Sequence, residues 1–134
     1  MDKLKLPARV DHLESLLSFV ELHAEKSGFP ENRLKEIKLA AEEALVNIIH
    51  YAYGEREGDV EVACRMDDKD SFIIEIRDTG VPFDIRSVSE PDLTSDISER
   101  KIGGLGIFLI KKMVDTIKYR RDGERNILSL INRK

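Results

Sequence analysis

The chain holds a single cysteine, Cys64, among its 134 residues, so no disulfide can form within it. This excludes the disulfide-stapled class of small secreted proteins and fits a reducing compartment. Because Cys64 stands in a run of alternating apolar and polar residues, we expect it to be a small buried hydrophobe.

Long apolar runs are missing as well. No segment approaches the roughly 18 apolar residues that indicate a membrane-spanning helix. The first residues also lack the apolar stretch of a signal peptide. We therefore expect a cytoplasmic protein without a membrane partner.

Positive charge is not in excess, since 22 Lys and Arg stand against 26 Asp and Glu, a net charge of −4. Proteins that bind nucleic acid directly concentrate Lys and Arg, so we expect no nucleic-acid partner. The basic residues between Lys111 and Arg125 leave two interpretations open: a solvated surface, or a surface that faces a protein partner or a phosphate.

The apolar pattern predicts one domain, residues 1–134, with no repeat and no linker. A chain of this length can bury its own core without disulfides or metals. Short turns join the predicted strand pairs, so we expect a two-layer α/β (α+β) sandwich, with helices on one face of a mixed, mostly antiparallel sheet. The expected elements are a short strand at 3–9, a helix with the apolar stripe Val10, Leu13, Leu17, Val20 and Ala24, a helix at 32–53, strands at 60–66 and 72–78, a polar loop at 84–101, a helix at 103–114, and strands at 117–121 and 127–131.

Three polar residues interrupt the apolar stretch 39–49: Glu42, Glu43 and Asn47. Glu43 and Asn47 are four residues apart and so share one helical face. The amide oxygen of an Asn suits Mg²⁺, and a Glu can orient a water or accept a proton from a hydroxyl. The same pair also fits a structural arrangement, in which Asn47 bonds a neighbouring strand and Glu43 is a surface charge.

Asp78 ends a strand whose alternate residues Phe72, Ile74 and Ile76 are apolar, so its carboxylate should face the core. A buried carboxylate needs hydrogen-bond donors, and the exocyclic amine of a purine is one. A ring that presents a carbonyl instead would be rejected. Gly80 would let the backbone pass close to a flat ring, although Asp-Thr-Gly is also an ordinary turn sequence.

Gly103, Gly104, Leu105 and Gly106 open an apolar helix. Glycines at a helix start let an anion approach the backbone amides, where the helix dipole favours negative charge. No Gly-Lys-Ser/Thr follows, which excludes a Walker loop. A plain loop-to-helix joint has a similar composition, so the glycine cluster indicates an anion site only in combination with the two other segments.

In this order the three segments, Glu-x-x-x-Asn at 43–47, Asp-x-Gly at 78–80 and Gly-x-Gly at 104–106, resemble the N, G1 and G2 boxes of the GHKL ATPase superfamily, which shares the Bergerat ATP-binding fold. More narrowly, residues 78–84 and 103–110 are similar to the RsbW-type anti-sigma factor serine-protein kinases of bacteria. The resemblance spans nearly the whole chain.

The resemblance implies ATP and Mg²⁺ as cofactors. It implies that Asn47 binds magnesium, that Asp78 binds the adenine amine and that Glu43 is the general base. The other nucleotide-binding residues that it implies are Gly80, Gly103, Gly104, Leu105 and Gly106 around the pocket, Ser129 near adenine, and Arg100 and Lys101 at the terminal phosphate.

The implied activity is phosphorylation of a serine in an anti-anti-sigma (STAS-domain) partner, with a sigma factor as the other partner and the segment 84–101 as a closing lid. An alternative from another class is a nucleotide-gated binding module that switches partners without efficient transfer. A stand-alone ATPase fits less well. A homodimer remains open.

The sequence departs from the family pattern at three positions. Ile48 stands where the family usually has Ala, and its bulk reduces the volume beside Asn47. Tyr51 takes the place where His is usual. Pro82 replaces the second glycine of the wider G1 pattern, and since it has no N–H to donate it can only shape the wall.

Overall fold

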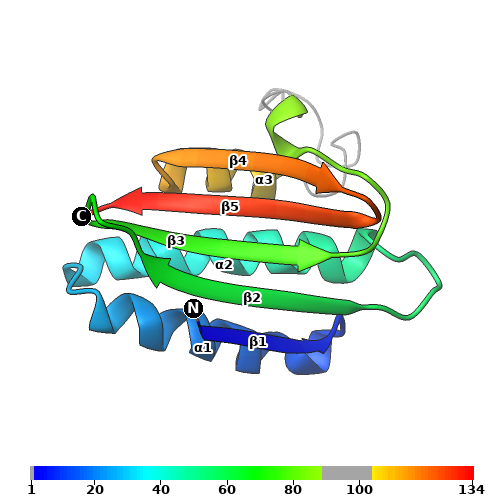
Figure 1. Ribbon diagram of the computed structural model, residues 1–134, viewed down its shortest axis with the longest axis horizontal. Coiled ribbons are helices and arrows are strands. Elements are labelled where there is room, and N and C mark those ends of the chain that lie inside the picture. The colour runs from blue at the N-terminus through cyan, green and yellow to red at the C-terminus, as the bar shows by residue number, and fades with distance from the viewer. Residues whose placement is uncertain (1, 89–103) are drawn as a thin grey trace.

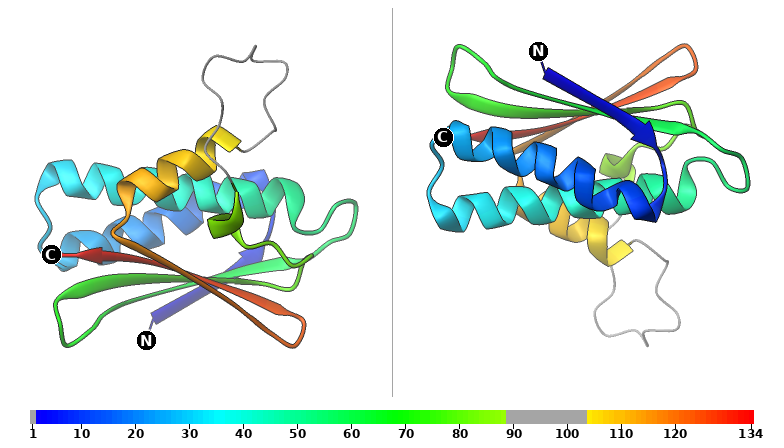
Figure 2. Two further views of the ribbon diagram at one scale, coloured as in Figure 1. Left: turned by 90° about the horizontal axis from the view of Figure 1, so that it is seen from above. Right: turned by 90° about the horizontal axis from the view of Figure 1, so that it is seen from below.

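The computed structural model describes residues 2–88 and 104–134. The elements are β1 (Asp2–Pro7), the 3-10 helix η1 (Val10–His12), α1 (Leu13–Lys26), α2 (Glu31–Tyr51), β2 (Asp59–Met66), β3 (Ser71–Asp78), the 3-10 helix η2 (Ile85–Ser87), α3 (Gly104–Met113), β4 (Thr116–Asp122) and β5 (Arg125–Arg133). They form two layers, with the three α-helices on one face of the sheet (Figure 1; Figure 2).

The sheet has the strand order β1-β2-β3-β5-β4. All four neighbouring pairs in the described ranges are antiparallel. The prediction of a two-layer α+β sandwich is therefore confirmed, but the mixed sheet is wrong because hairpins join β2 to β3 and β4 to β5 and no parallel pair occurs among these strands.

The core lies between the inner face of the sheet and the helices. Phe72, Ile74 and Ile76 of β3 are each at most 1% exposed, as the alternation predicts. The predicted stripe of the first helix is correct for its later residues, but Val10 is 61% exposed. The reason is that η1 precedes α1, and its tighter winding places Val10 out of phase with the helix stripe.

Helix ends follow ordinary backbone rules. Gly28 has the left-handed φ of 85° just after α1, and Pro30 precedes the first turn of α2. α2 ends at Tyr51, two residues before the predicted end. The chain must leave the helix there because the Tyr53 hydroxyl bonds the carbonyl of Asp59 and accepts from the amide of Thr79 at 2.9 Å.

The two hairpins bring the ends of β3 and β5 together. Asp67 accepts bonds from the amides of Lys69 and Ser71, both at 2.9 Å, and closes the β2–β3 turn. In the register of β3 with β5, Asp78 faces Asn126. Asp78 and Asn126, forty-eight positions apart in the sequence, thus become neighbours on the helix side of the sheet.

Cys64 is 3% exposed, as expected of a small hydrophobe, and burial raises the pKa of its thiol to about 12. None of the helices in residues 2–88 and 104–134 is long and apolar enough to cross a membrane.

Candidate functional site

A cavity of about 300 Å³ opens between α2, α3 and the ends of β3, β4 and β5. Its wall is mainly apolar, with a few polar groups, which is the usual composition of a small-molecule site. The lining residues are Ala44, Asn47, Ile48, Tyr51, Ala52, Asp78, Val81, Phe83, Ile85, Ile107, Tyr119, Asn126 and Leu128.

Asp78 lies in the wall of this cavity and is 6% exposed, so the prediction that it faces the core is confirmed. Its Oδ1 atom accepts from the amide of Gly80 at 2.8 Å and from Nδ2 of Asn126 at 2.9 Å. No residue in the described ranges donates to Oδ2. One oxygen of the carboxylate is fixed by the protein, and the other remains an acceptor.

Asn126 is a site residue that the sequence did not predict. Its Oδ1 accepts from the Tyr119 hydroxyl at 2.6 Å and from Nη1 of Arg121 at 3.1 Å. Its Nδ2 also donates to the carbonyl of Val81 at 2.9 Å. The available signal was a polar residue in the row Asn126, Leu128, Leu130, two positions from apolar residues on a strand that has to bury one face.

Gly80 does not line the cavity directly. A Cβ at this position would collide with the backbone carbonyl of Ala52, and the amide of Val81 donates to that same carbonyl at 2.9 Å. The close backbone approach that the sequence predicts therefore exists, but it is made to the end of α2. That a flat ring also lies near Gly80 stays a prediction.

Asn47 lines the cavity one helical turn after Glu43. Its Nδ2 atom is buried without a hydrogen-bond partner among the described residues. The alternative in which Asn47 bonds a neighbouring strand is therefore wrong for this part of the structure. The carboxamide is available to a ligand.

Glu43 lies beside the first turn of α3, because a Cβ at Gly106 would collide with its carboxylate oxygen Oε2. Burial, with a smaller contribution from the neighbouring Glu42 carboxylate, raises the pKa of Glu43. The structure thus joins the first and third sequence segments. A glycine at 106 lets α3 approach α2 closely at this carboxylate.

The rest of the predicted glycine segment is only partly described. α3 begins at Gly104, and Leu105 is 46% exposed and does not line the cavity. Arg100, Lys101 and Gly103 lie outside the described residues.

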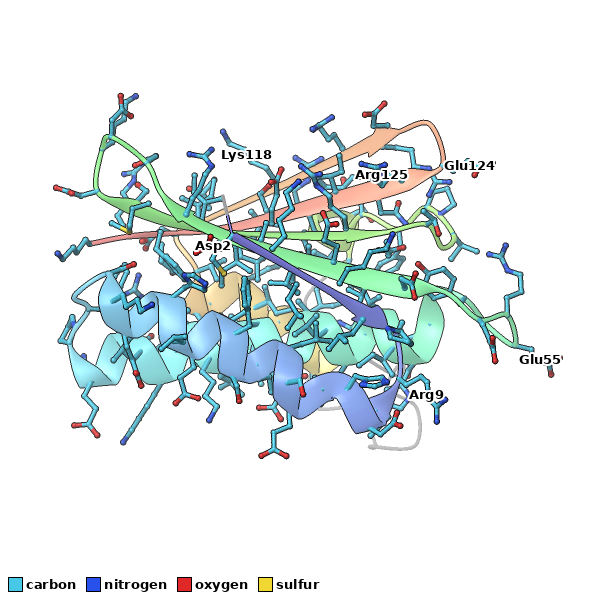
Figure 3. The ribbon with its side chains drawn as sticks, turned by 60° about the horizontal axis from the view of Figure 1, so that its bottom comes forward. Asp2, Arg9, Glu55, Lys118, Glu124 and Arg125 are labelled. Atoms are coloured by element: carbon cyan, nitrogen blue, oxygen red, sulfur yellow. The ribbon has the colours of Figure 1, made fainter. Side chains whose placement is uncertain are left out.

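Ser129 is not brought to the cavity, and that prediction is wrong. It pairs with Glu75 of β3 and Lys118 of β4, on the face of the sheet away from the helices. Figure 3 shows Lys118 on that open side. Alternation along β5 turns the neighbouring Leu128 into the cavity in its place.

Two features of the rim were partly foreseen. Ile48 lines the cavity beside Asn47, as its bulk suggests, and Tyr51 forms part of the same wall. The loop expected from residue 84 instead contains η2, where Asp84 accepts from the amide of Arg86 at 3.0 Å. This turn buries Ile85 in the cavity wall, a contact that no periodicity indicated.

Comparison with known proteins agrees with this geometry. The family model described as histidine kinase-like ATPase domain matches residues 6–132. The serine-protein kinase RsbW of Listeria monocytogenes serovar 1/2a is 28% identical over 124 residues, which cover 89% of this chain and 78% of that protein. The protein of the same name from Bacillus thuringiensis subsp. konkukian is 27% identical over 130 residues, covering 94% and 81%.

Solved structures show the same fold. A Mycobacterium tuberculosis protein with RsbU and RsbW domains superposes with a TM-score of 0.64 at 12% identity, covering 99% of this chain and only 32% of that chain. The histidine kinase domain of a blue-light activated kinase from Erythrobacter litoralis gives 0.60 at 17% identity, covering 90% and 60%.

The match to the family model extends over nearly the whole chain, and the curated relatives align with most of its length. The chain therefore belongs to the histidine kinase-like ATPase domain family, and both of the relatives named above are serine-protein kinases RsbW.

Proposed function

We propose that the chain is a serine-protein kinase that uses Mg-ATP to phosphorylate an anti-anti-sigma partner. The observation that carries this proposal is that the two ends of the cavity carry different polar groups. One end presents an acceptor oxygen of Asp78. Asn47 lines the other end, and Glu43 lies just outside the lining, beside the first turn of α3. A nucleotide needs both kinds of group, one for its base and one for its phosphates.

At the base end, Oδ2 of Asp78 accepts a hydrogen bond from the exocyclic amine of adenine. Apolar side chains from three elements, Ile48, Ile107 and Leu128, line the space where the ring lies. At about 300 Å³ the cavity is at the lower end of the usual range for small-molecule sites, so the phosphates extend out of it towards α3.

At the phosphate end, the amides at the start of α3 point out of the helix, and the glycines at 104 and 106 present no side chain that would obstruct them. The unpartnered carboxamide of Asn47 fits one magnesium ligand. No cluster of three His, Cys, Asp or Glu in the described part of the chain forms a separate metal site, so phosphate oxygens and water would complete the coordination. Bound magnesium would neutralise phosphate charge during transfer.

Glu43 is the residue that we assign to proton transfer. Its carboxylate accepts the proton of the partner's serine hydroxyl as that oxygen attacks the terminal phosphorus and ADP leaves. Its raised pKa makes it a better proton acceptor than an ordinary glutamate. Arg100, Lys101 and Gly103 remain predicted phosphate contacts from the resemblance.

The partner is proposed from the relatives, which are named serine-protein kinases RsbW. A STAS-domain protein would be the phosphate acceptor, and a sigma factor would be the alternative partner that is released or held. A second function is favoured by one observation: Ile48 fills space directly after Asn47 in the cavity wall. If this bulk keeps magnesium from its position, the chain binds nucleotide and switches partners without efficient transfer.

The test is incubation with γ-labelled ATP, magnesium and a STAS-domain partner encoded beside the chain, with the partner's acceptor Ser→Ala as control. Label on the wild-type partner alone supports the kinase. ATP binding without any labelled partner contradicts it and leaves the binding module. Under that outcome, Ile48→Ala should restore transfer, since it creates space beside Asn47.

A further inference from the structure

The orientation of the Asn126 carboxamide is fixed by the chemistry of its neighbours. A guanidinium only donates, so the Asn126 atom that faces Nη1 of Arg121 at 3.1 Å must be the oxygen. The Tyr119 hydroxyl donates to the same oxygen at 2.6 Å. On the other side the backbone carbonyl of Val81, which only accepts, lies 2.9 Å from the nitrogen.

This orientation determines what Asp78 can do. Nδ2 of Asn126 and the amide of Gly80 both donate to Oδ1 of Asp78, at 2.9 and 2.8 Å. Oδ1 therefore acts as an acceptor towards the protein. The remaining oxygen, Oδ2, receives no bond from the described residues and is the oxygen left for a ligand.

We call the bonds of Tyr119 and Arg121 to Asn126 the clamp. Arg121 also bonds the backbone that follows β3. Its Nη1 atom also donates to the carbonyl of Gly80 at 2.8 Å. Asn126 is 5% exposed, so its bond to Asp78 is shielded from water, whereas Arg121 is exposed and its two bonds are only partly buried. The Asp78 carboxylate is therefore held by the Gly80 amide and also by β4 and β5, two strands that none of the three sequence segments includes.

We propose that Asn126, clamped by Arg121 and Tyr119, is the positioning residue for base selection: it holds Asp78 as an acceptor, so that the cavity takes a purine with a ring amine and rejects one with a carbonyl at the same place. The proposal rests on the nucleotide-binding function above and deepens it. A site with a fixed acceptor loses a hydrogen bond and gains a repulsive oxygen pair when the ring amine becomes a carbonyl.

Mg-ATP and Mg-ITP are suitable probes because ITP has a carbonyl in place of the ring amine of ATP, with a hydrogen on the neighbouring ring nitrogen that adenine lacks. Calorimetric titration of the wild-type chain should show ATP binding at least about tenfold more tightly than ITP. Asn126→Asp keeps the shape but replaces the donor with a carboxylate that repels Asp78. Its preference for ATP should fall towards one, mainly through loss of ATP affinity.

Two adjacent arginines of β4 provide a matched pair. Arg121→Ala removes a donor from the clamp and should lower the ATP-to-ITP ratio. Arg120→Ala should leave the ratio unchanged, because Arg120 faces Ile127 on the open side of the sheet and pairs with Asp122 at 3.8 Å. In the Asn126→Ala background Arg121→Ala should change the ratio less than it does alone, because only its bond to the carbonyl of Gly80 is left to lose; general loss of stability would not produce this non-additivity.

The outcomes separate this proposal from the one on which it rests. If the wild type binds no ATP, the proposed function is wrong. If it prefers ATP while Asn126→Asp and Arg121→Ala keep the same ratio, only the role of Asn126 is overturned. Thermal unfolding by circular dichroism checks each variant, and if Asn126→Asp does not fold, Tyr119→Phe replaces it. That variant lacks a single hydroxyl and should lower the ratio by less, and an unchanged ratio there overturns the proposal.

Discussion

The two ends of the cavity are built in opposite ways. At the base end, Asp78, Asn126 and Arg121 are joined to each other and to backbone groups by hydrogen bonds of 2.8–3.1 Å. At the phosphate end, the side chains of Asn47 and Glu43 have no hydrogen-bond or ion-pair partner among the described residues. The base end is held in place by its own hydrogen bonds and leaves one acceptor oxygen of Asp78 free, whereas the phosphate end has no such bonds among the described residues.

The difference indicates a division of labour. Fixed donors and acceptors select a ligand because a wrong group leaves them unpaired. A buried donor without a partner costs about 1–3 kcal/mol, and in native proteins such a group calls for a specific explanation. At Asn47 the explanation we favour is a ligand. Glu43 is similar, since burial keeps its carboxylate from full solvation.

The largest loss of activity should come from a substitution at the phosphate end. Glu43→Ala removes the proton acceptor, so phosphate transfer to the partner should fall about 10²–10⁴-fold, the usual contribution of a positioned base. ATP affinity should change little, because Glu43 does not line the cavity. Initial rates with γ-labelled ATP and a binding titration check both halves. Normal transfer by Glu43→Ala would remove the base assignment.

A somewhat smaller effect is expected at Asn47. Asn47→Ala should abolish the gain in ATP affinity that magnesium gives, a loss of about 10–100-fold on the scale of altered metal sites. Asn132→Ala is the matched control, because Asn132 also has a buried Nδ2 without a partner in the described ranges but lies in the core. It should lower stability and leave the magnesium dependence intact. If ATP binding depended equally on magnesium in both variants, Asn47 would not be the magnesium ligand.

Gly80 lies near the base end and Gly106 near the phosphate end, so substitutions at these two glycines compare the ends directly. Gly80→Ala forces a Cβ against the backbone of Ala52, which cannot move aside easily, so unfolding free energy should fall by about 1–3 kcal/mol. Gly106→Ala meets only the mobile carboxylate of Glu43, so stability should change less and transfer more. Denaturant unfolding and transfer rates of the two variants separate these effects. The reverse ranking would be incompatible with the structure.

The smallest effect is on pH dependence. Glu43 acts as a base only when deprotonated, so transfer should rise with pH through its pKa, which burial places above 4.5, the ordinary value. Glu42→Gln removes the smaller, electrostatic cause of the shift and should move this rise to lower pH. The pH–rate profile at saturating ATP tests it. An unchanged profile in Glu42→Gln would mean that another group limits the rate.

Local periodicity allowed most of the fold to be predicted from the sequence. The alternation of Phe72, Ile74 and Ile76 correctly turns Asp78 towards the core, because one residue step in a strand reverses the face. The helices failed only at their ends. Val10 is exposed because a 3-10 turn precedes α1, and α2 stops early because Tyr53 bonds the ends of two strands.

Non-local contacts account for what the sequence missed at the site. Asn126, Arg121 and Tyr119 act on Asp78 only through the register of β5 with β3 and β4, which no single segment encodes. Ser129 was assigned to the cavity by position, and the alternation along β5 places it on the other face. The close neighbour of Gly80 is likewise a distant helix end.

The central claim, that one nucleotide spans both ends of the cavity, is tested most directly by amide NMR during a titration with Mg-ATP. The account predicts saturable one-to-one binding, with large shifts of the side-chain amides of Asn47 and Asn126 and of the backbone amide of Gly106. Shifts confined to one end, or located on the open face of the sheet around Lys118, would contradict it.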